Sequence, residues 1–220
     1  MKVASLKLEV SESIGTVSAE LIAPDSLKAI VTLAHGAGAG MNHPFMTALA
    51  NELAQLGIGT LRFNFPFTEQ KKKRPDFPAV AHKTIEAAIN KAHELFPSIP
   101  LFVSGKSFGG RMSSQLLSKT HFDFVKGLIF FGFPLHAPGK LTIDRADHLK
   151  EVKVPMLFIQ GTRDELATWS LIEKVTNELS LATLEKLEGA NHAFKSGKQN
   201  LIPVIAQATK EWISKASQHL

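Results

Sequence analysis

Short apolar runs alternate with longer amphipathic stretches along most of this chain. Runs such as residues 28–34, 125–131 and 154–161 are rich in β-branched and aromatic residues, as in strands that are buried on both faces. The intervening stretches, such as residues 44–57 and 202–216, carry apolar residues at helical spacing. This alternation predicts an α/β fold whose mostly parallel sheet is covered by helices on both faces.

The N-terminal part of the chain has a different pattern. Residues 3–10 and 15–22 alternate apolar and polar positions on either side of the short turn SESI, which predicts an antiparallel hairpin. No internal repeat, low-complexity tract or linker interrupts the 220 residues. We therefore expect one domain that spans residues 1–220.

Composition narrows the class of protein. Hydrophobic residues make up 44% of the chain and charged residues 20%, which is ordinary for a globular protein. The absence of cysteine excludes disulfides and thiolate chemistry. The N-terminus has no signal-peptide pattern, and the longest strongly apolar run, residues 127–135, is too short to span a bilayer. We expect a cytoplasmic protein that does not insert into a membrane, either a monomer or a homodimer.

The net charge of +5 raises the question of an acidic partner. The only dense cluster is KKKR at residues 71–74, and a short run of this kind usually forms a solvated loop. Basic and aromatic residues are not interleaved as in a groove for single strands, so we expect no nucleic-acid partner. A positive rim that attracts an acidic substrate, formed by this loop with Lys106, Arg111 and Lys140, is an alternative.

The segment FVSGKSFGG, residues 102–110, matches parts of two motifs with different chemistry. Its GKS resembles the end of a phosphate-binding loop, but that loop requires glycine at position 100, where this chain has Pro100. Its G-x-S-x-G matches the turn that presents a serine nucleophile between a strand and a helix. Strand-like residues precede this turn and a helical pattern follows it, so we expect Ser107 to be a nucleophile.

A serine nucleophile needs a base and an acid, which follow it in the order Ser, acid, His in this kind of fold. Asp164 comes just after the strand at residues 154–161, and His192 lies between the last strand and the last helix. Each has a simpler explanation, Asp164 as a helix N-cap and His192 as a surface histidine. Their joint placement with Ser107 favours a catalytic triad.

Hydrolysis through a serine also needs two backbone N–H donors for the oxyanion. We expect them from Phe108 and from Ala37, which lies in the loop HGAGAG after the third strand. A dinucleotide-binding loop fits HGAGAG less well, because its spacing is G-x-G-x-G. Candidate substrate contacts lie beside these donors: His35, Gly36, Phe65 and Lys106. His35 also suits a structural role in this loop.

The remaining histidines show no metal-ligand spacing: His43, His82, His93, His121, His136, His148 and His219. The chain also has no H-E-x-x-H motif and no acidic cluster. We therefore expect neither a metal nor another cofactor.

These motifs resemble the α/β-hydrolase superfamily, in particular its dienelactone-hydrolase-like members and a group of small bacterial α/β-hydrolases related to testis-expressed protein thirty. The resemblance runs from about residue 29 to the C-terminus and includes AHGAGAGMNHPFM, GKSFGGRMSSQ, VPMLFIQGTRDE and NHAFK. It implies a triad of Ser107, Asp164 and His192 and supplies no substrate. Only residues 132–153 separate the sixth strand from the next, which leaves room for a loop and a short helix but not for a lid domain.

The sequence thus predicts a serine hydrolase that cleaves a small ester or thioester through an acyl-enzyme. One alternative is a non-catalytic scaffold or interaction module with the same fold, although such a protein has no reason to keep an intact triad. Another is a C–C hydrolase or an acyltransferase. These enzymes share the fold and the triad, so the sequence does not separate them.

Overall fold

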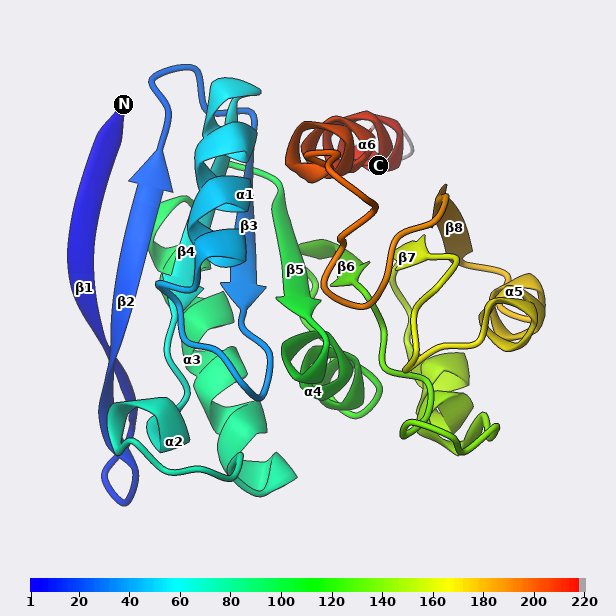
Figure 1. The fold of residues 1–220 in the computed structure, drawn as a ribbon. Coiled ribbons are helices and arrows are strands. Elements are labelled where there is room, and N and C mark those ends of the chain that lie inside the picture. Colours follow the sequence, from blue (N-terminus) through cyan, green and yellow to red (C-terminus); the bar gives the residue numbers. More distant parts are fainter. Residues whose placement is uncertain (218–220) are drawn as a thin grey trace.

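The apolar runs form the strands of one eight-stranded sheet in the computed structural model, which describes residues 1–217 (Figure 1). The strands are β1 (Lys2–Ser11), β2 (Gly15–Ala23), β3 (Ala29–Ala34), β4 (Ile58–Phe63), β5 (Leu101–Lys106), β6 (Val125–Phe131), β7 (Met156–Gly161) and β8 (Ala182–Leu187). Their order across the sheet is β1-β2-β4-β3-β5-β6-β7-β8. His219, one of the histidines without metal-ligand spacing, lies outside the described residues.

The pairing of the strands confirms the predicted topology. β1 and β2 form the N-terminal antiparallel hairpin, and β2 also runs antiparallel to β4. All other neighbouring strands pair in parallel. The carboxyl ends of β3 to β8 therefore meet at one edge of the sheet, which is where ligands bind in folds of this kind.

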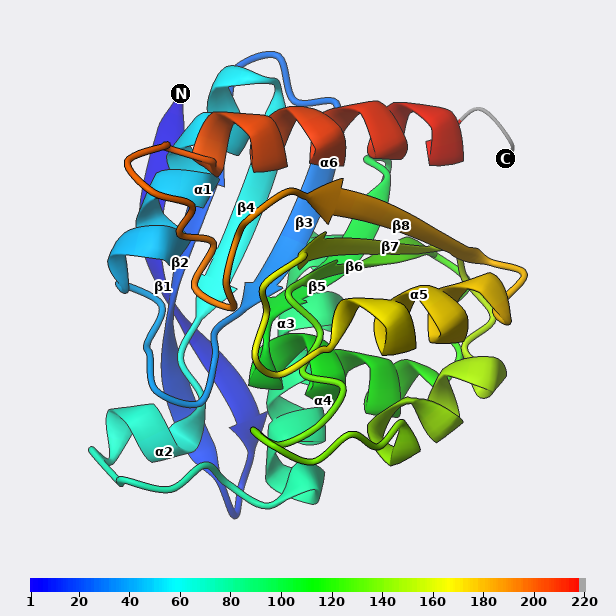
Figure 2. The same cartoon turned by 45° about the vertical axis from the view of Figure 1, so that its right-hand side comes forward.

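Helices cover both faces of the sheet (Figure 2). They are α1 (Pro44–Gln55), α2 (Pro66–Glu69), α3 (Pro78–Leu95), α4 (Phe108–Leu117), α5 (Trp169–Asn177), α6 (Ile202–Ala216) and the 3-10 helix η1 (Asp144–Glu151). α1 and α6 pack on one face, and α3, α4 and α5 pack on the other. In the part of the chain that the structure describes, no helix combines the length and apolar character needed to cross a membrane.

Neighbouring residues of the central strands belong to opposite layers of the core. In β3, Ile30 packs in the layer of α3 and α4, and Val31 packs in the layer of α1 and α6. In β5, Val103 packs in the layer of α3 and α4, and Phe102 packs in the layer of α1 and α6. Full burial of one such side chain contributes roughly 1.5–3 kcal/mol. Because both faces are covered, these strands have no polar face, which explains their continuous apolar runs.

The connection between β6 and β7 contains only a loop and η1. The prediction that no lid domain is inserted there is confirmed.

Helix α2 was not predicted, because a single turn of four residues carries no periodicity. The KKKR run, residues 71–74, follows α2 and is exposed.

A buried arginine joins the sheet to the loop before α1. Arg62 of β4 is only 2% exposed. Its Nη1 donates to the Met41 carbonyl at 2.8 Å and to Thr47 Oγ1 at 2.9 Å, and its Nη2 pairs with the Glu20 carboxylate of β2. A buried guanidinium is tolerated when its charge is paired, and here Nη1 and Nη2 are bonded while Nε has no partner. These contacts therefore hold residues 41–47 against the sheet.

Replacement of Arg62 by leucine should lower the free energy of unfolding by about 3 kcal/mol, because it leaves Glu20 without its cation and two oxygen atoms without their donor. Urea unfolding followed by circular dichroism measures this change. The control is Lys91→Gln, which breaks the surface pair of Lys91 and Glu94 at 2.6 Å. That change should cost no more than about 0.5 kcal/mol. Equal losses in the two variants would show that Arg62 does not hold the loop.

Candidate active site

The turn between β5 and α4 holds Ser107 in a rare backbone conformation. Its φ is 52° and its ψ is −114°, a region that residues with a side chain seldom adopt. A Cβ on Gly105 would lie 2.3 Å from the Gly110 nitrogen. A Cβ on Gly109 would lie 2.5 Å from the Ala34 carbonyl oxygen. The helix therefore folds back against the strands with backbone touching backbone, and this packing projects Ser107 from the carboxyl end of the sheet.

Ser107, His192 and Asp164 form a continuous series of hydrogen bonds. His192 Nε2 lies 2.8 Å from Ser107 Oγ, and His192 Nδ1 lies 2.8 Å from Asp164 Oδ2. A carboxylate oxygen accepts, so Nδ1 carries the proton and Nε2 is free to accept from the serine hydroxyl. The Asp164 side chain is fully buried, whereas that of His192 is 15% exposed. The structure thus brings together the three residues that the sequence singled out.

Two further hydrogen bonds fix the orientation of the Asp164 carboxylate. Leu166 N donates to Oδ1 at 2.8 Å, and Gln160 Nε2 donates to Oδ2 at 2.6 Å. Gln160 is itself fully buried, and its Oε1 accepts from Phe133 N at 2.9 Å. Gln160 was not among the site residues predicted from the sequence. A polar residue near the end of an otherwise apolar strand was the available signal.

Close packing places the loops of Asp164 and His192 side by side. A Cβ on Gly161, at the end of β7, would lie 2.2 Å from the Ala190 carbonyl oxygen. Arg163 N donates to the same carbonyl at 2.9 Å. Only glycine fits at the end of β7, and this close contact sets the distance between the Asp164 loop and the His192 loop.

Lys106 supports the His192 loop from the other side. Its Nζ donates to the His192 carbonyl oxygen at 2.6 Å and lies 4.7 Å from the centre of the Phe194 ring. Burial lowers the pKa of Lys106 to about 8, and the nearby Asp164 and Glu165 charges oppose this shift. Lys106 borders a cavity at Ser107, but its ammonium group is used to hold the loop.

The glycine-rich loop after β3 lies across from Ser107. A Cβ on Gly36 would lie 3.7 Å from the Ser107 Cβ. Ala37 and Phe108 both border a cavity together with Ser107. The Ala37 N–H has no backbone acceptor among residues 1–217, and the Phe108 N–H, at the start of α4, has no acceptor within its helix. Two amide donors are therefore available next to the serine.

His35 fixes the shape of this loop from inside the protein. Its Nδ1–H donates to the Gly36 carbonyl at 2.8 Å, and its Nε2 accepts from Phe65 N at 3.1 Å. Burial lowers the pKa of His35 to about 4, so the ring is neutral at pH 7. His35 and Phe65 are fully buried and border neither cavity at Ser107. The structure thus places these two candidate substrate contacts behind the loop, where they support it.

Two cavities meet at Ser107. The first, of about 460 Å³, is bordered by α4 and η1 and includes Arg111 and Arg145. The second, of about 280 Å³, is bordered by α1 and the His192 loop. Three residues border both cavities: Ala37, Ser107 and Leu166. A substrate therefore has room on both sides of the serine. Arg145 was not among the predicted site residues.

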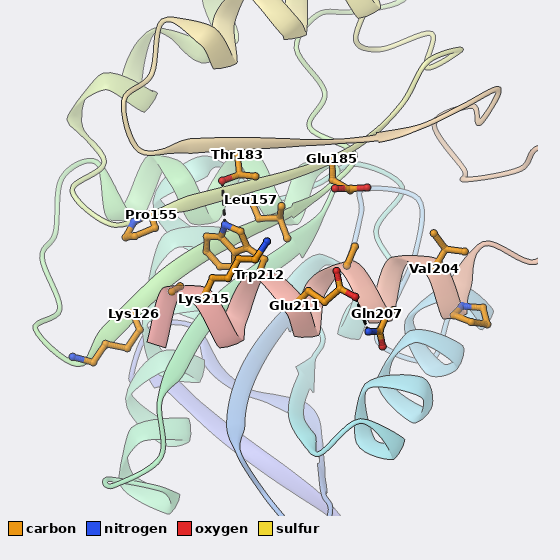
Figure 3. A pocket seen from close by; sticks show the side chains of 13 residues that line it. Lys126, Pro155, Leu157, Thr183, Glu185, Val204, Gln207, Glu211, Trp212 and Lys215 are labelled. Atoms are coloured by element: carbon orange, nitrogen blue, oxygen red, sulfur yellow. Dashed lines mark hydrogen bonds between the residues drawn. The ribbon is translucent and has the colours of Figure 1, made fainter. Parts of the chain in front are cut away.

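A larger cavity, of about 830 Å³, lies between β8 and α6 (Figure 3). Trp212 Nε1 donates to Thr183 Oγ1 at 3.3 Å there, and Gln207 Nε2 donates to Glu211 Oε1 at 2.7 Å. No histidine and none of the residues around Ser107 borders it. We therefore locate the candidate site at Ser107, where a nucleophile, a base and an acid meet. The described residues 1–217 hold no group of three or more His, Asp or Glu side chains arranged to bind a metal ion.

The fold and the site geometry define a lidless α/β protein with a serine on a strand-to-helix turn. A family model described as "Alpha/beta hydrolase domain" matches residues 27–218, and the chain belongs to this family. The resemblance seen in the sequence is thus confirmed at the level of the family.

Solved structures share the fold over nearly their whole length. Dienelactone hydrolase from Anabaena variabilis ATCC 29413 is 20% identical with a TM-score of 0.79, over 97% of each chain. XC6422 from Xanthomonas campestris, described as an α/β serine hydrolase without a lid, is 20% identical with a TM-score of 0.77, over 98% of this chain and 95% of that one. The esterase domain of a Rhodothermus marinus protein is 15% identical with a TM-score of 0.73, over 96% of this chain and 98% of that one. At these identities the likeness establishes the fold.

The buried His35 should make stability depend on pH. The unfolded chain binds a proton at this residue below about pH 6.5, whereas the folded protein binds it only near pH 4. Full stability is therefore present above pH 6.5 and is progressively lost as the pH falls to 4. Between pH 7.5 and pH 5.0 the loss from His35 should be about 2 kcal/mol. His148, whose pKa burial also lowers to about 4, acts in the same direction.

Urea unfolding of the His35→Asn variant at these two pH values isolates its contribution. Asparagine keeps a donor for the Gly36 carbonyl but does not titrate, so the pH-dependent loss should shrink by about 2 kcal/mol. His121→Asn is the control, because that side chain is 64% exposed. An undiminished pH dependence in His35→Asn would show that His35 is not the buried neutral group described here.

Proposed function

We propose that this protein is a serine hydrolase that cleaves small esters or thioesters through an acyl-enzyme. The observation that carries the proposal is the hydrogen-bonded series of Ser107, His192 and Asp164 on a strained strand-to-helix turn. Membership of the α/β-hydrolase family supports it. So do the names of the structural relatives, which include a dienelactone hydrolase, a serine hydrolase and an esterase domain.

In the first half of the reaction, Ser107 Oγ attacks the carbonyl carbon while His192 Nε2 accepts the hydroxyl proton. A C–O bond forms, and the carbonyl electron pair moves to oxygen. His192 then gives the proton to the departing alcohol or thiol as its bond to carbon breaks. The Asp164 carboxylate, 2.8 Å from Nδ1, stabilises the imidazolium that exists between these two steps.

The N–H groups of Ala37 and Phe108 stabilise the oxyanion. They are fixed before the substrate arrives, so no reorganisation is required as charge develops. The start of α4 adds the positive end of a helix dipole at the same place. One such donor is typically worth 10²–10³-fold in kcat, on the order of 3–4 kcal/mol. Support of the Ala37 loop by His35 therefore contributes to the reaction although His35 does not touch the substrate.

In the second half, water replaces the departed group. His192 Nε2 accepts a proton from this water as its oxygen attacks the ester carbon, and Ser107 Oγ regains a proton when the bond to it breaks. The site has no lid, and its two cavities of about 460 and 280 Å³ suit a small acyl group and a small leaving group. Deep burial of a long lipid chain does not fit this shape.

Replacement of Ser107 or His192 by alanine should abolish labelling by a fluorophosphonate probe. Each variant should also lower kcat for 4-nitrophenyl butyrate by at least about 10³-fold, because the nucleophile or its base is missing. Fluorescence of the labelled band, with mass spectrometry of the modified peptide, measures the first effect. Absorbance of released 4-nitrophenolate measures the second.

Ser114 provides a matched control. Its Oγ lies 2.7 Å from His148 Nε2, so the chain contains another contact between a serine and a histidine. Ser114 is fully buried, and its hydroxyl donates to the Arg111 carbonyl at 2.9 Å. The Ser114→Ala variant should therefore label like the wild type. A folded wild-type protein that takes no label would refute the proposal and favour a non-catalytic scaffold.

A further inference from the structure

The cavity of about 460 Å³ beside Ser107 contains two arginine side chains from different elements. Arg111 lies one turn of α4 after Ser107, and its backbone N–H donates to the Ser107 carbonyl at 3.0 Å. Arg145 lies in η1, within the connection between β6 and β7. Two cationic groups thus border the same space as the nucleophile.

Neither guanidinium has an acidic partner. Among residues 1–217, no carboxylate forms an ion pair with either side chain. Arg145 Nη1 donates to the Pro134 carbonyl at a long 3.3 Å, and the Arg111 side chain donates to no described residue. Burial and the nearby Arg145 charge lower the pKa of Arg111. Since each guanidinium has five N–H donors, most of these donors have no partner among residues 1–217.

The other charged groups around the cavity leave it positive. Asp76, whose Oδ2 accepts from Phe67 N at 2.8 Å, also borders it and offsets only one of the two arginine charges. His148 lies close to Arg111 and is neutral at pH 7, because burial and the Arg111 charge lower its pKa to about 4. The exposed KKKR run, residues 71–74, directly precedes the segment that forms one wall. This arrangement attracts an anion toward the serine.

We propose that Arg111 and Arg145 bind a carboxylate of the substrate. The substrate is then an ester or thioester that carries a carboxylate a few carbon atoms from the reacting carbonyl. Arg111 follows Ser107 by one turn of α4, about 5.4 Å along the helix, so the bound carboxylate lies near the reacting carbonyl. A carboxylate matches arginine by accepting two parallel hydrogen bonds. The inference rests on the proposed function and names its substrate class. Lys106 is not part of the pair, because its ammonium group donates to the His192 carbonyl.

The carboxylate can belong to either half of the ester, and two pairs of substrates separate these cases. 4-Nitrophenyl hydrogen glutarate and its methyl ester differ by a charge on the acyl part. 4-Acetoxybenzoate and its methyl ester differ by a charge on the alcohol part. In one pair, kcat/KM for the charged ester should exceed that for the neutral ester by at least about ten-fold at low ionic strength, after subtraction of the uncatalysed rate. The pair that shows this preference identifies the half that carries the anion.

The variants Arg111→Gln and Arg145→Gln test the residues. Each should lower the ratio of kcat/KM for the charged and neutral esters by about ten-fold or more, because a charge-assisted hydrogen bond is lost. Lys140→Gln is the control, since it removes an equal charge from an exposed position on the neighbouring loop. It should change the ratio by less than about two-fold at physiological salt, where exposed charges are screened. Thermal unfolding of each variant checks that it is folded.

A binding measurement separates this inference from the proposed function. In the Ser107→Ala background, calorimetry should detect binding of monomethyl glutarate, and either arginine variant should weaken it about ten-fold or more. If ester hydrolysis depends on Ser107 while both pairs show equal kcat/KM in all variants, the arginine pair has no role and the hydrolase stands. If no ester is cleaved and Ser107 takes no label, the proposed function fails. Arginine-dependent binding of monomethyl glutarate would still support the anion site in that case, and its absence would overturn it.

Discussion

Contact between the backbone of α4 and the ends of β3 and β5 is the constraint on which the rest of the site depends. Gly105 and Gly109 have no side chains because backbone atoms occupy the positions where a Cβ would lie. Of the three residues between them, Ser107 has a positive φ. The same contact brings the start of α4 next to the loop that contains Ala37. One packing arrangement therefore sets the positions of both Ser107 and the two amide N–H groups beside it.

The buried polar side chains around the site can each place their protons in only one way. The Gly36 carbonyl requires a proton on Nδ1 of His35, and Phe65 N–H requires an acceptor at Nε2. Phe133 N–H requires the oxygen of the Gln160 amide, which turns its NH₂ group toward Asp164. In each case a backbone group that can only donate or only accept fixes where the side chain carries its protons. The side chain then orients its other partner, which belongs to the site. Such a network is rigid because every alternative leaves a buried group unpaired.

The sequence singled out Ser107, Asp164 and His192, which the structure brings together, because each follows a strand and the carboxyl ends of parallel strands meet at one edge. It also revealed the order of strands and helices, because buried strands and amphipathic helices have different periods. It did not reveal whether a side chain at a strand end faces the cavity or the core. The structure buries Phe65 and His35 behind their loop, which for His35 is the structural role that the sequence also suggested. That choice depends on loop backbone angles. Arg145 lies in a segment without periodicity, and only the folded chain shows which wall it faces.

The atoms of the site come from parts of the chain that are far apart. Ser107 and His192 are separated by 85 residues, and the tether between Lys106 and His192 spans 86. Contacts of this range form late in folding, because long loops must close before the contacts can form. A nascent chain that has emerged only as far as α5 contains Ser107 but not His192. The series of hydrogen bonds from Ser107 to Asp164 is therefore complete only when β8 and the loop after it have joined the sheet.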